Sequence, residues 1–212
     1  MLGLVAMLGL PGLASGQDVK SVLAAAEKAY HASTSFRADF TQTIENPMLG
    51  APETSRGTMF LNPPDRFAMR FSQPQGDRVV ADGKWLWVFA PSSVPDQVIR
   101  QSIPKGGTAT PNFFAQFLDR PLERYNATLV GKDSIGGVIV DVVRLVPKFK
   151  DQPFTQATIA IGRADGLMRR VAIVEETGQK RLVVLPAPQA GATIPAEEFI
   201  FRTPKGVKVV TP

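Results

Sequence analysis

The sequence contains no cysteine and a single histidine. The absence of cysteine excludes disulfide bonds, thiolate zinc sites and thiol nucleophiles. It also removes the residue on which a bacterial lipoprotein carries its acyl anchor, so we expect that the protein is not itself a lipoprotein. The one histidine, His31, follows Tyr30 near the end of a predicted helix, which is more typical of a helix-end residue than of a catalytic base.

Motifs of the common enzyme classes are missing as well. The sequence has no GxSxG, HExxH or P-loop pattern. Its carboxylate pairs, Glu175 with Glu176 and Glu197 with Glu198, are neighbours along the chain. Neighbouring side chains in a strand point to opposite faces, which suits solvent better than acid/base chemistry. We therefore predict no catalytic residue, no metal site and no cofactor, and we expect that the protein is not an enzyme.

The charge excess is modest, with 24 Lys and Arg against 19 Asp and Glu and a net charge of +5. The basic residues are scattered and form only short pairs such as Arg169 and Arg170. Because nucleic-acid binding needs a concentrated patch and a recognisable motif, we predict none. Hydrophobic residues make up 44% of the 212, beside 18 Gly and 18 Pro, which favours a turn-rich, mainly β protein. This length predicts one domain, over residues 17–212.

The first 16 residues read MLGLVAMLGLPGLASG and end in the small residues Ala14, Ser15 and Gly16. An apolar stretch that meets small residues before a polar segment is typical of a secretory signal peptide. No Lys or Arg precedes this stretch, so we expect that the precursor begins further upstream. The pattern predicts export from the cytoplasm.

The remaining chain changes period once. Between Asp18 and Ser33 apolar residues recur every three to four positions, which predicts an amphipathic helix. From Ser35 onward the apolar residues alternate and turn signals separate short runs, which predicts a meandering antiparallel sheet of about eleven strands. The segment 110–118, TPNFFAQFL, interrupts this pattern and predicts a short apolar helix.

A sheet of this size has an apolar face that must be covered. A curved sheet under two helices can enclose a hollow, and aromatic and Met side chains adapt well to a variable apolar guest. The pattern alone leaves open whether these residues line a cavity or pack as a filled core. The candidate lining consists of Phe36, Phe40, Met59, Leu61, Phe67, Met69, Phe71, Trp85, Trp87, Phe89, Phe113, Phe114 and Phe117.

Several blocks of the chain resemble the periplasmic lipoprotein carrier family LolA in order and spacing. The resemblance extends from Asp18 to Thr211, and its shared order is more specific than any one block. The blocks are SFRADFTQ (35–42), GTMFLNPPDRF (57–67), VVADGKWLWVFAP (79–91), TPNFF (110–114), IGRADGLMRRVAIVEETGQ (161–179) and FIFRTPKGVKVV (199–210).

The resemblance implies an unclosed antiparallel β-barrel, a half-barrel of about eleven strands, with a helical lid over a hydrophobic cavity. It further implies a monomeric periplasmic carrier that takes the acyl chains of lipoproteins from an inner-membrane ABC transporter of the LolCDE type. The acceptor would be an outer-membrane receptor of the LolB type. Energy would come from the transporter, so no cofactor is expected.

One position departs from the family pattern. The family places an Arg before the Pro of an RPxxF segment, where it holds the lid shut, and here that position is Pro63. Arg66 is the nearby candidate for a substitute latch, although a shift of three residues along a strand reverses the side chain's face. Phe67 matches the cavity Phe of the segment.

Two other binding or structural roles stay open at this stage. The missing latch Arg leaves room for another amphiphile, such as a phospholipid or a glycolipid, on the same half-barrel. A filled β-sandwich with a structural role is the third possibility. Binding of a fluorescent apolar dye separates a hollow domain from a filled one.

Overall fold

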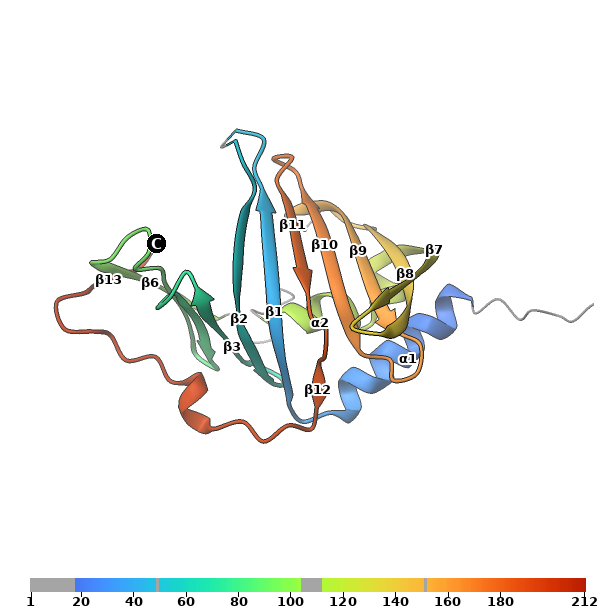
Figure 1. Cartoon of the computed structure of the whole chain (residues 1–212), viewed down its shortest axis with the longest axis horizontal. Helices are drawn as coiled ribbons and strands as arrows, with labels where there is room; N and C mark the ends of the chain where they lie inside the picture. The colour runs from blue at the N-terminus through green and yellow to red at the C-terminus, as the bar shows by residue number, and fades with distance from the viewer. Residues whose placement is uncertain (1–17, 49, 104–111, 151) are drawn as a thin grey trace, which may run out of the picture.

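The computed structural model describes residues 18–48, 50–103, 112–150 and 152–212 (Figure 1). The predicted signal peptide, residues 1–16, lies outside them. Within the described part of the chain, no helix combines the length and the apolar character needed to cross a membrane.

Three helices are present in this part of the chain: α1 (Val19–Ala32), α2 (Phe113–Leu118) and α3 (Pro121–Arg124). The side chain of Asp18 caps α1 by accepting the backbone N–H groups of Lys20 and Ser21, which otherwise have no partner in the first turn. The stripe of Val22, Leu23, Ala26 and Tyr30 is buried. Both helices that the sequence predicts are confirmed, and α3 is an addition.

The strands form one mixed, open sheet. It has thirteen strands in the described residues, more than the eleven expected, in the order β13-β6-β5-β4-β3-β2-β1-β11-β10-β9-β8-β7, with β12 beside β1. The expected open antiparallel sheet is confirmed, with one exception at an edge, where the short strand β13 pairs in parallel with β6. The strands are β1 (Phe36–Glu45), β2 (Glu53–Asn62), β3 (Arg66–Gln73), β4 (Arg78–Asp82), β5 (Trp85–Phe89), β6 (Gln97–Ser102), β7 (Tyr125–Ile135), β8 (Val138–Pro147), β9 (Phe154–Gly162), β10 (Met168–Glu175), β11 (Lys180–Val184), β12 (Gln189–Ala190) and β13 (Lys208–Val210).

We call the sheet face that carries Phe36, Phe40 and Met59 the inner face. Its side chains form the main core together with the buried stripe of α1 and with Phe114, Phe117 and Leu118 of α2 and its end. The alternation of buried and exposed residues along β1 follows from the two-residue period of a strand. The helices therefore cover the inner face, and α1 crosses the end of the sheet that holds β8 to β10 (Figure 1).

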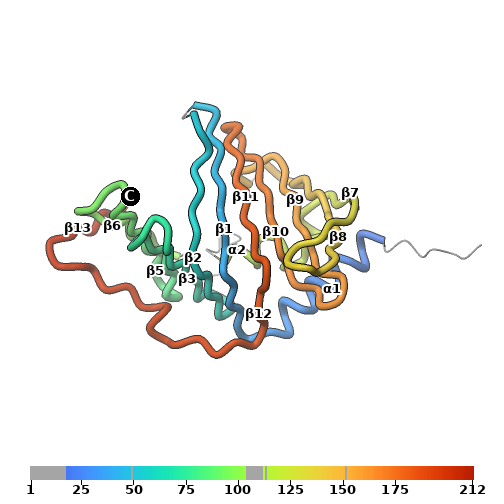
Figure 2. The backbone as a smooth tube through the Cα atoms, viewed as in Figure 1, coloured from blue at the N-terminus to red at the C-terminus, as the bar shows by residue number. Residues whose placement is uncertain are grey.

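The opposite, outer face has a cover of its own over β2 to β5. After β11 the chain runs through the 3₁₀-helix η1 (Ala196–Phe199) and continues along this side of the molecule to β13 (Figure 2). Phe60, Ala68 and Val80 of the sheet form a second buried cluster with Phe199. The half of the sheet that begins at β2 is therefore covered on its outer face by an extended segment.

Candidate functional site

Most of the predicted lining residues meet in the apolar cluster on the inner face. Phe36, Phe40, Met59, Leu61, Phe67, Phe114 and Phe117 are buried there, and Met69 and Phe71 are partly buried against them. The side chain of Phe113 lies outside the described residues. Their common location is thus established for nine positions, while their contact with a lipid stays a prediction.

Three predicted lining residues lie on the other side of the sheet. Trp87 is opposite Val80 across the β4–β5 ladder and packs with the outer cluster. Its ring stacks on Phe201 at 5.3 Å between centroids, and Phe89 lies 5.8 Å from the same ring. The placement of Trp85, Trp87 and Phe89 in the cavity is therefore wrong. All five residues of β5 are apolar, so alternation in the sequence does not reveal which of them face the helices.

A polar contact fixes Trp87 on the outer face. The carboxylate of Asp82 accepts the indole Nε1–H of Trp87 at 2.9 Å and the backbone N–H groups of Lys84 and Trp85. Burial alone would raise the pKa of Asp82, but the hydrogen bonds outweigh that effect and lower the pKa below its ordinary value. The β4–β5 turn is thereby tied to the tryptophan that supports the outer cover.

Beneath the helices the inner face is closely packed. Phe36 stacks between Tyr30 of α1 and Phe114 of α2, with ring centroids 6.2 and 5.6 Å apart. The pocket that these rings line with Ala26, Leu118 and Met168 encloses about 10 Å³. A single water needs about this much space, so the pocket is too small for a hydrocarbon chain. In this conformation the helices' own side chains occupy the inner face.

The half of the inner face further from α1 is less covered. Met69, Phe71, Val79 and Leu86 pack against the core but stay partly exposed. Gly57 lets the β2 backbone lie close to Phe40 and to β3, because a Cβ there would lie 2.9 Å from Cε1 of Phe40 and would overlap the carbonyl of Arg70. The apolar surface of the buried core therefore continues toward β5 as a partly buried strip.

Arg66 does not act as the latch that the sequence analysis proposes. It is exposed, and it lines an outer-face pocket with Asp82 and Phe199. The physical reason is the strand period, because residue 66 shares its face with Ala68 while Phe67 points to the helices. The latch assignment to Arg66 is therefore wrong.

A polar residue that the sequence analysis missed joins the helices to the sheet. Asn112 is fully buried, and its Oδ1 caps α2 by accepting the N–H groups of Phe114 and Ala115 at 3.1 Å each. Its Nδ2 donates to the Tyr30 hydroxyl at 2.8 Å and to the carbonyl of Pro64 at 3.2 Å. The available signal was an Asn before an apolar helical run, the usual N-cap pattern.

Burial also affects the phenol in this contact. Desolvation raises the pKa of Tyr30 above its ordinary value of 10.0, and the Coulomb effect of Asp119 adds to it, while the hydrogen bond from Asn112 lowers it. The hydroxyl is consequently held in its neutral form, which can accept from Asn112. Asn112 thus connects α1, α2 and the β2–β3 turn at one point.

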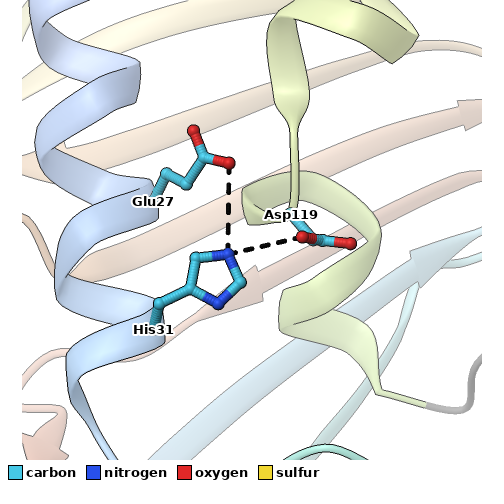
Figure 3. A group of neighbouring side chains, drawn as sticks. All are labelled: Glu27, His31 and Asp119. Carbon is cyan, nitrogen blue, oxygen red and sulfur yellow. Dashed lines mark ion pairs between the residues drawn. The ribbon is translucent and has the colours of Figure 1, made fainter.

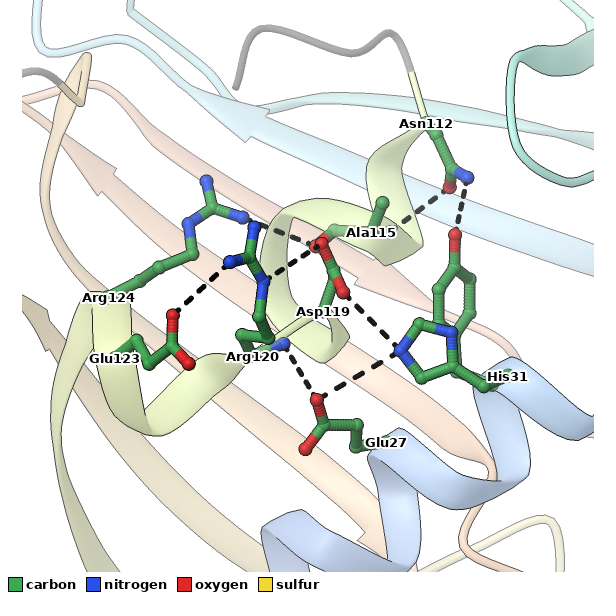
Figure 4. A network of polar contacts seen from close by, with 9 residues as sticks. Glu27, His31, Asn112, Ala115, Asp119, Arg120, Glu123 and Arg124 are labelled. Atoms are coloured by element: carbon green, nitrogen blue, oxygen red, sulfur yellow. Dashed lines mark hydrogen bonds and ion pairs between the residues drawn. The ribbon is translucent and has the colours of Figure 1, made fainter. Parts of the chain in front are cut away.

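A second polar group joins the two helices at the surface. Nε2 of His31 lies 3.3 Å from Oδ1 of Asp119 and 4.0 Å from Oε1 of Glu27 (Figure 3). The same Glu27 oxygen accepts the backbone N–H of Arg120 at 3.0 Å (Figure 4). Arg120 has a φ of 48°, a left-handed conformation unusual for a residue with a side chain. These contacts hold the end of α2 beside α1.

Solved structures with a similar fold include a protein from Thermus thermophilus and MucB from Pseudomonas aeruginosa. An uncharacterised conserved protein from Thermus thermophilus has a TM-score of 0.55 at 16% identity, over 91% of this chain and 98% of that one. MucB in the Pseudomonas aeruginosa MucA/MucB complex has a TM-score of 0.52 at 16% identity, over 92% of this chain and 64% of that one. At such identities the likeness shows the fold alone.

Sequence comparison is more specific. An outer-membrane lipoprotein carrier protein from Klebsiella pneumoniae strain 342 is 29% identical over 177 residues, which cover 83% of this chain and 81% of the relative. The profile of the outer membrane lipoprotein carrier protein LolA family matches residues 31–202, which span β1 to η1 and include α2. The chain therefore belongs to the LolA family of outer membrane lipoprotein carrier proteins.

Proposed function

We propose that this protein shields the acyl chains of lipoproteins in the periplasm and carries them between the two membranes as a monomer. The donor would be an inner-membrane ABC transporter of the LolCDE type, and the acceptor an outer-membrane receptor of the LolB type. The observation that carries the proposal is the inner face, an apolar surface covered by short helices, in a chain of the lipoprotein carrier family. The task requires binding and release without covalent chemistry, so no enzymatic step is part of it.

The energetics explain why such a carrier needs a cover that moves. Three acyl chains of ordinary length expose apolar surface worth about 30 kcal/mol, at ~0.8 kcal/mol per CH₂. Non-covalent affinities saturate near ~20 kcal/mol, and a carrier that recovered even this much would not release its cargo. If Phe36, Phe114 and their neighbours refill the space after release, part of that free energy is returned.

The proposal assigns a path to the cargo. The partly buried strip of Met69, Phe71, Val79 and Leu86 is the first apolar surface that an acyl chain can reach. Deeper entry requires α2 to move away from Phe36, which breaks the ring stack and the hydrogen bonds of Asn112. Asn112 would therefore take the role that the latch Arg has in the family.

A second candidate cargo is a phospholipid or a glycolipid. Pro63 favours it, because the family has its latch Arg at this position and this chain does not. The two cargoes differ in what must be present for release from a membrane. Lipoprotein transfer needs the transporter and ATP, whereas a phospholipid carrier extracts lipid from protein-free vesicles.

The test uses inner-membrane vesicles that contain a triacylated lipoprotein and its ABC transporter. With ATP and the purified protein, the proposal expects lipoprotein in the soluble fraction, bound one to one, and its transfer to outer-membrane vesicles added afterwards. The matched control omits ATP, and a second control uses protein-free vesicles followed by mass spectrometry of extracted lipid. Absence of lipoprotein release would contradict the proposal, and phospholipid extraction without ATP would establish the second candidate instead.

A further inference from the structure

Three side chains that can bind a metal ion lie where α1 meets the residue that ends α2. Glu27 and His31 are one helical turn apart on α1, at the spacing that places two side chains on one face. Asp119, the C-cap of α2, faces them from the other helix (Figure 3). One ligand atom from each of the three residues lies within 4.8 Å of the others. An imidazole nitrogen with two carboxylate oxygens is a donor set that zinc accepts.

One of the distances in this group already equals the separation of two zinc ligands. Ligands at about 2.0–2.1 Å from a tetrahedral zinc ion lie about 3.3 Å apart. Nε2 of His31 and Oδ1 of Asp119 are 3.3 Å apart, and Oε1 of Glu27 is 4.0 Å from the same nitrogen. The side chains are between a third and a little over half exposed, so an ion can enter from solvent and the side chains can adjust.

The surrounding charges also favour a cation. Glu27 has no Lys or Arg side chain within ion-pair distance among the described residues, because its contact with Arg120 is to the backbone N–H. The Arg120 guanidinium reaches Asp119 only at 3.9 Å, through the other carboxylate oxygen, and lies 3.4 Å from Glu123 (Figure 4). Oδ1 of Asp119 therefore faces the imidazole without a strong cationic partner.

We propose that Glu27, His31 and Asp119 bind a divalent transition-metal ion, with zinc as the best match, and that this ion joins α1 to the end of α2. Three protein ligands leave a fourth position for water. The ion binds the folded arrangement of two helices, so it stabilises the protein against unfolding. This proposal is independent of the nature of the cargo.

The experiment exploits the single histidine. The protein is purified without a polyhistidine tag, and its single imidazole is labelled with ¹⁵N. ZnCl₂ is then titrated in, while NMR follows the His signal and calorimetry measures the affinity. MgCl₂ is the control ion. We expect the imidazole signal to shift with zinc and not with magnesium. His31→Ala and Asp119→Asn should each weaken zinc binding by at least about 10–100-fold, which is the loss caused by removing a residue that only supports a metal ligand.

Matched variants make the result decisive. Glu176→Gln removes an exposed carboxylate that follows β10 and is outside the proposed ligand set, so it should keep the zinc affinity of the parent. Glu27→Gln serves if Asp119→Asn does not fold. Zinc should also raise the melting temperature of the parent protein by more than that of His31→Ala at the same zinc concentration. An unmoved imidazole signal, or equal zinc affinity in His31→Ala, would show adventitious binding and overturn the proposal.

Discussion

The two covers of the sheet are built differently. On the outer face, the C-terminal segment is joined to the sheet by backbone hydrogen bonds at both ends, through β12 beside β1 and β13 beside β6. On the inner face, α1 and α2 pack through side chains, and within the described ranges no hydrogen bond between two backbone groups ties either helix to a strand. The inner cover can therefore separate from the sheet without breaking a ladder, whereas the outer cover cannot.

The polar contacts follow the same division. The inner cover depends on Asn112, on the group around His31 and on the hydroxyl of Tyr125 in β7, which donates to the Gln116 carbonyl of α2 at 2.8 Å. The outer cover adds an ion pair between Arg70 and Glu198 at 3.1 Å to its backbone pairing. A mobile lid should be held by few contacts, and breaking them should disrupt little backbone structure. The comparison indicates which face opens, and three changes test it, beginning with the largest expected effect.

Phe114 and Phe199 provide a matched pair, since each is 3% exposed and each belongs to one cover. Phe114→Ala and Phe199→Ala should both lower the free energy of unfolding by about 3–5 kcal/mol, because each leaves a cavity in a packed cluster. Phe114→Ala alone should increase the binding of a fluorescent apolar dye to the folded protein. Equal dye binding by the two variants would remove the distinction between the covers.

Asn112→Ala tests the polar tie of the inner cover. It removes the cap of α2 and leaves the Tyr30 hydroxyl and the Pro64 carbonyl without their partner, which should cost about 1–3 kcal/mol of stability. We expect faster dye uptake than in the parent, measured by stopped-flow fluorescence. Tyr30→Phe keeps the cap and should show a smaller change; unaltered uptake in Asn112→Ala would show that Asn112 does not hold the cover.

Tyr30 gives the smallest of the three effects, and it depends on pH. A phenol with a raised pKa holds its proton more tightly in the folded protein, so its stabilising contribution is complete below the unfolded value of about 10. It is lost as pH rises through the folded pKa. Denaturant unfolding between pH 9 and 11 should therefore show a steeper loss of stability in the parent than in Tyr30→Phe, and parallel curves would argue against a buried neutral phenol.

The sequence predicted the helices and most of the inner face because these elements repeat a clear period. The stripe of α1 recurs every three to four residues, and Phe36, Ala38 and Phe40 alternate with polar residues, so one face is determined. In β5 every residue is apolar, and the sequence contains no information on which side faces the helices. The tryptophans were misassigned for this reason.

The outer cover was not predicted, because its local signals are weak. β13 has three residues, and β12 has two, so neither contains a period that could be recognised. Their positions depend on pairing with distant strands. Asn112 and Asp119 similarly acquire their partners only when α2 is placed beside α1. Contacts between separate elements were thus the part that local patterns could not supply.

Site-specific photocrosslinking tests whether acyl chains bind on the inner face of the sheet, as we propose. Phe71 on the inner strip and Phe89 on the outer face are both partly buried aromatic residues, and each is replaced by a photoreactive phenylalanine analogue. With a triacylated lipopeptide, the account predicts a crosslinked product at position 71 and none at position 89. Crosslinking at position 89, or at neither position while the lipopeptide is bound, would contradict it.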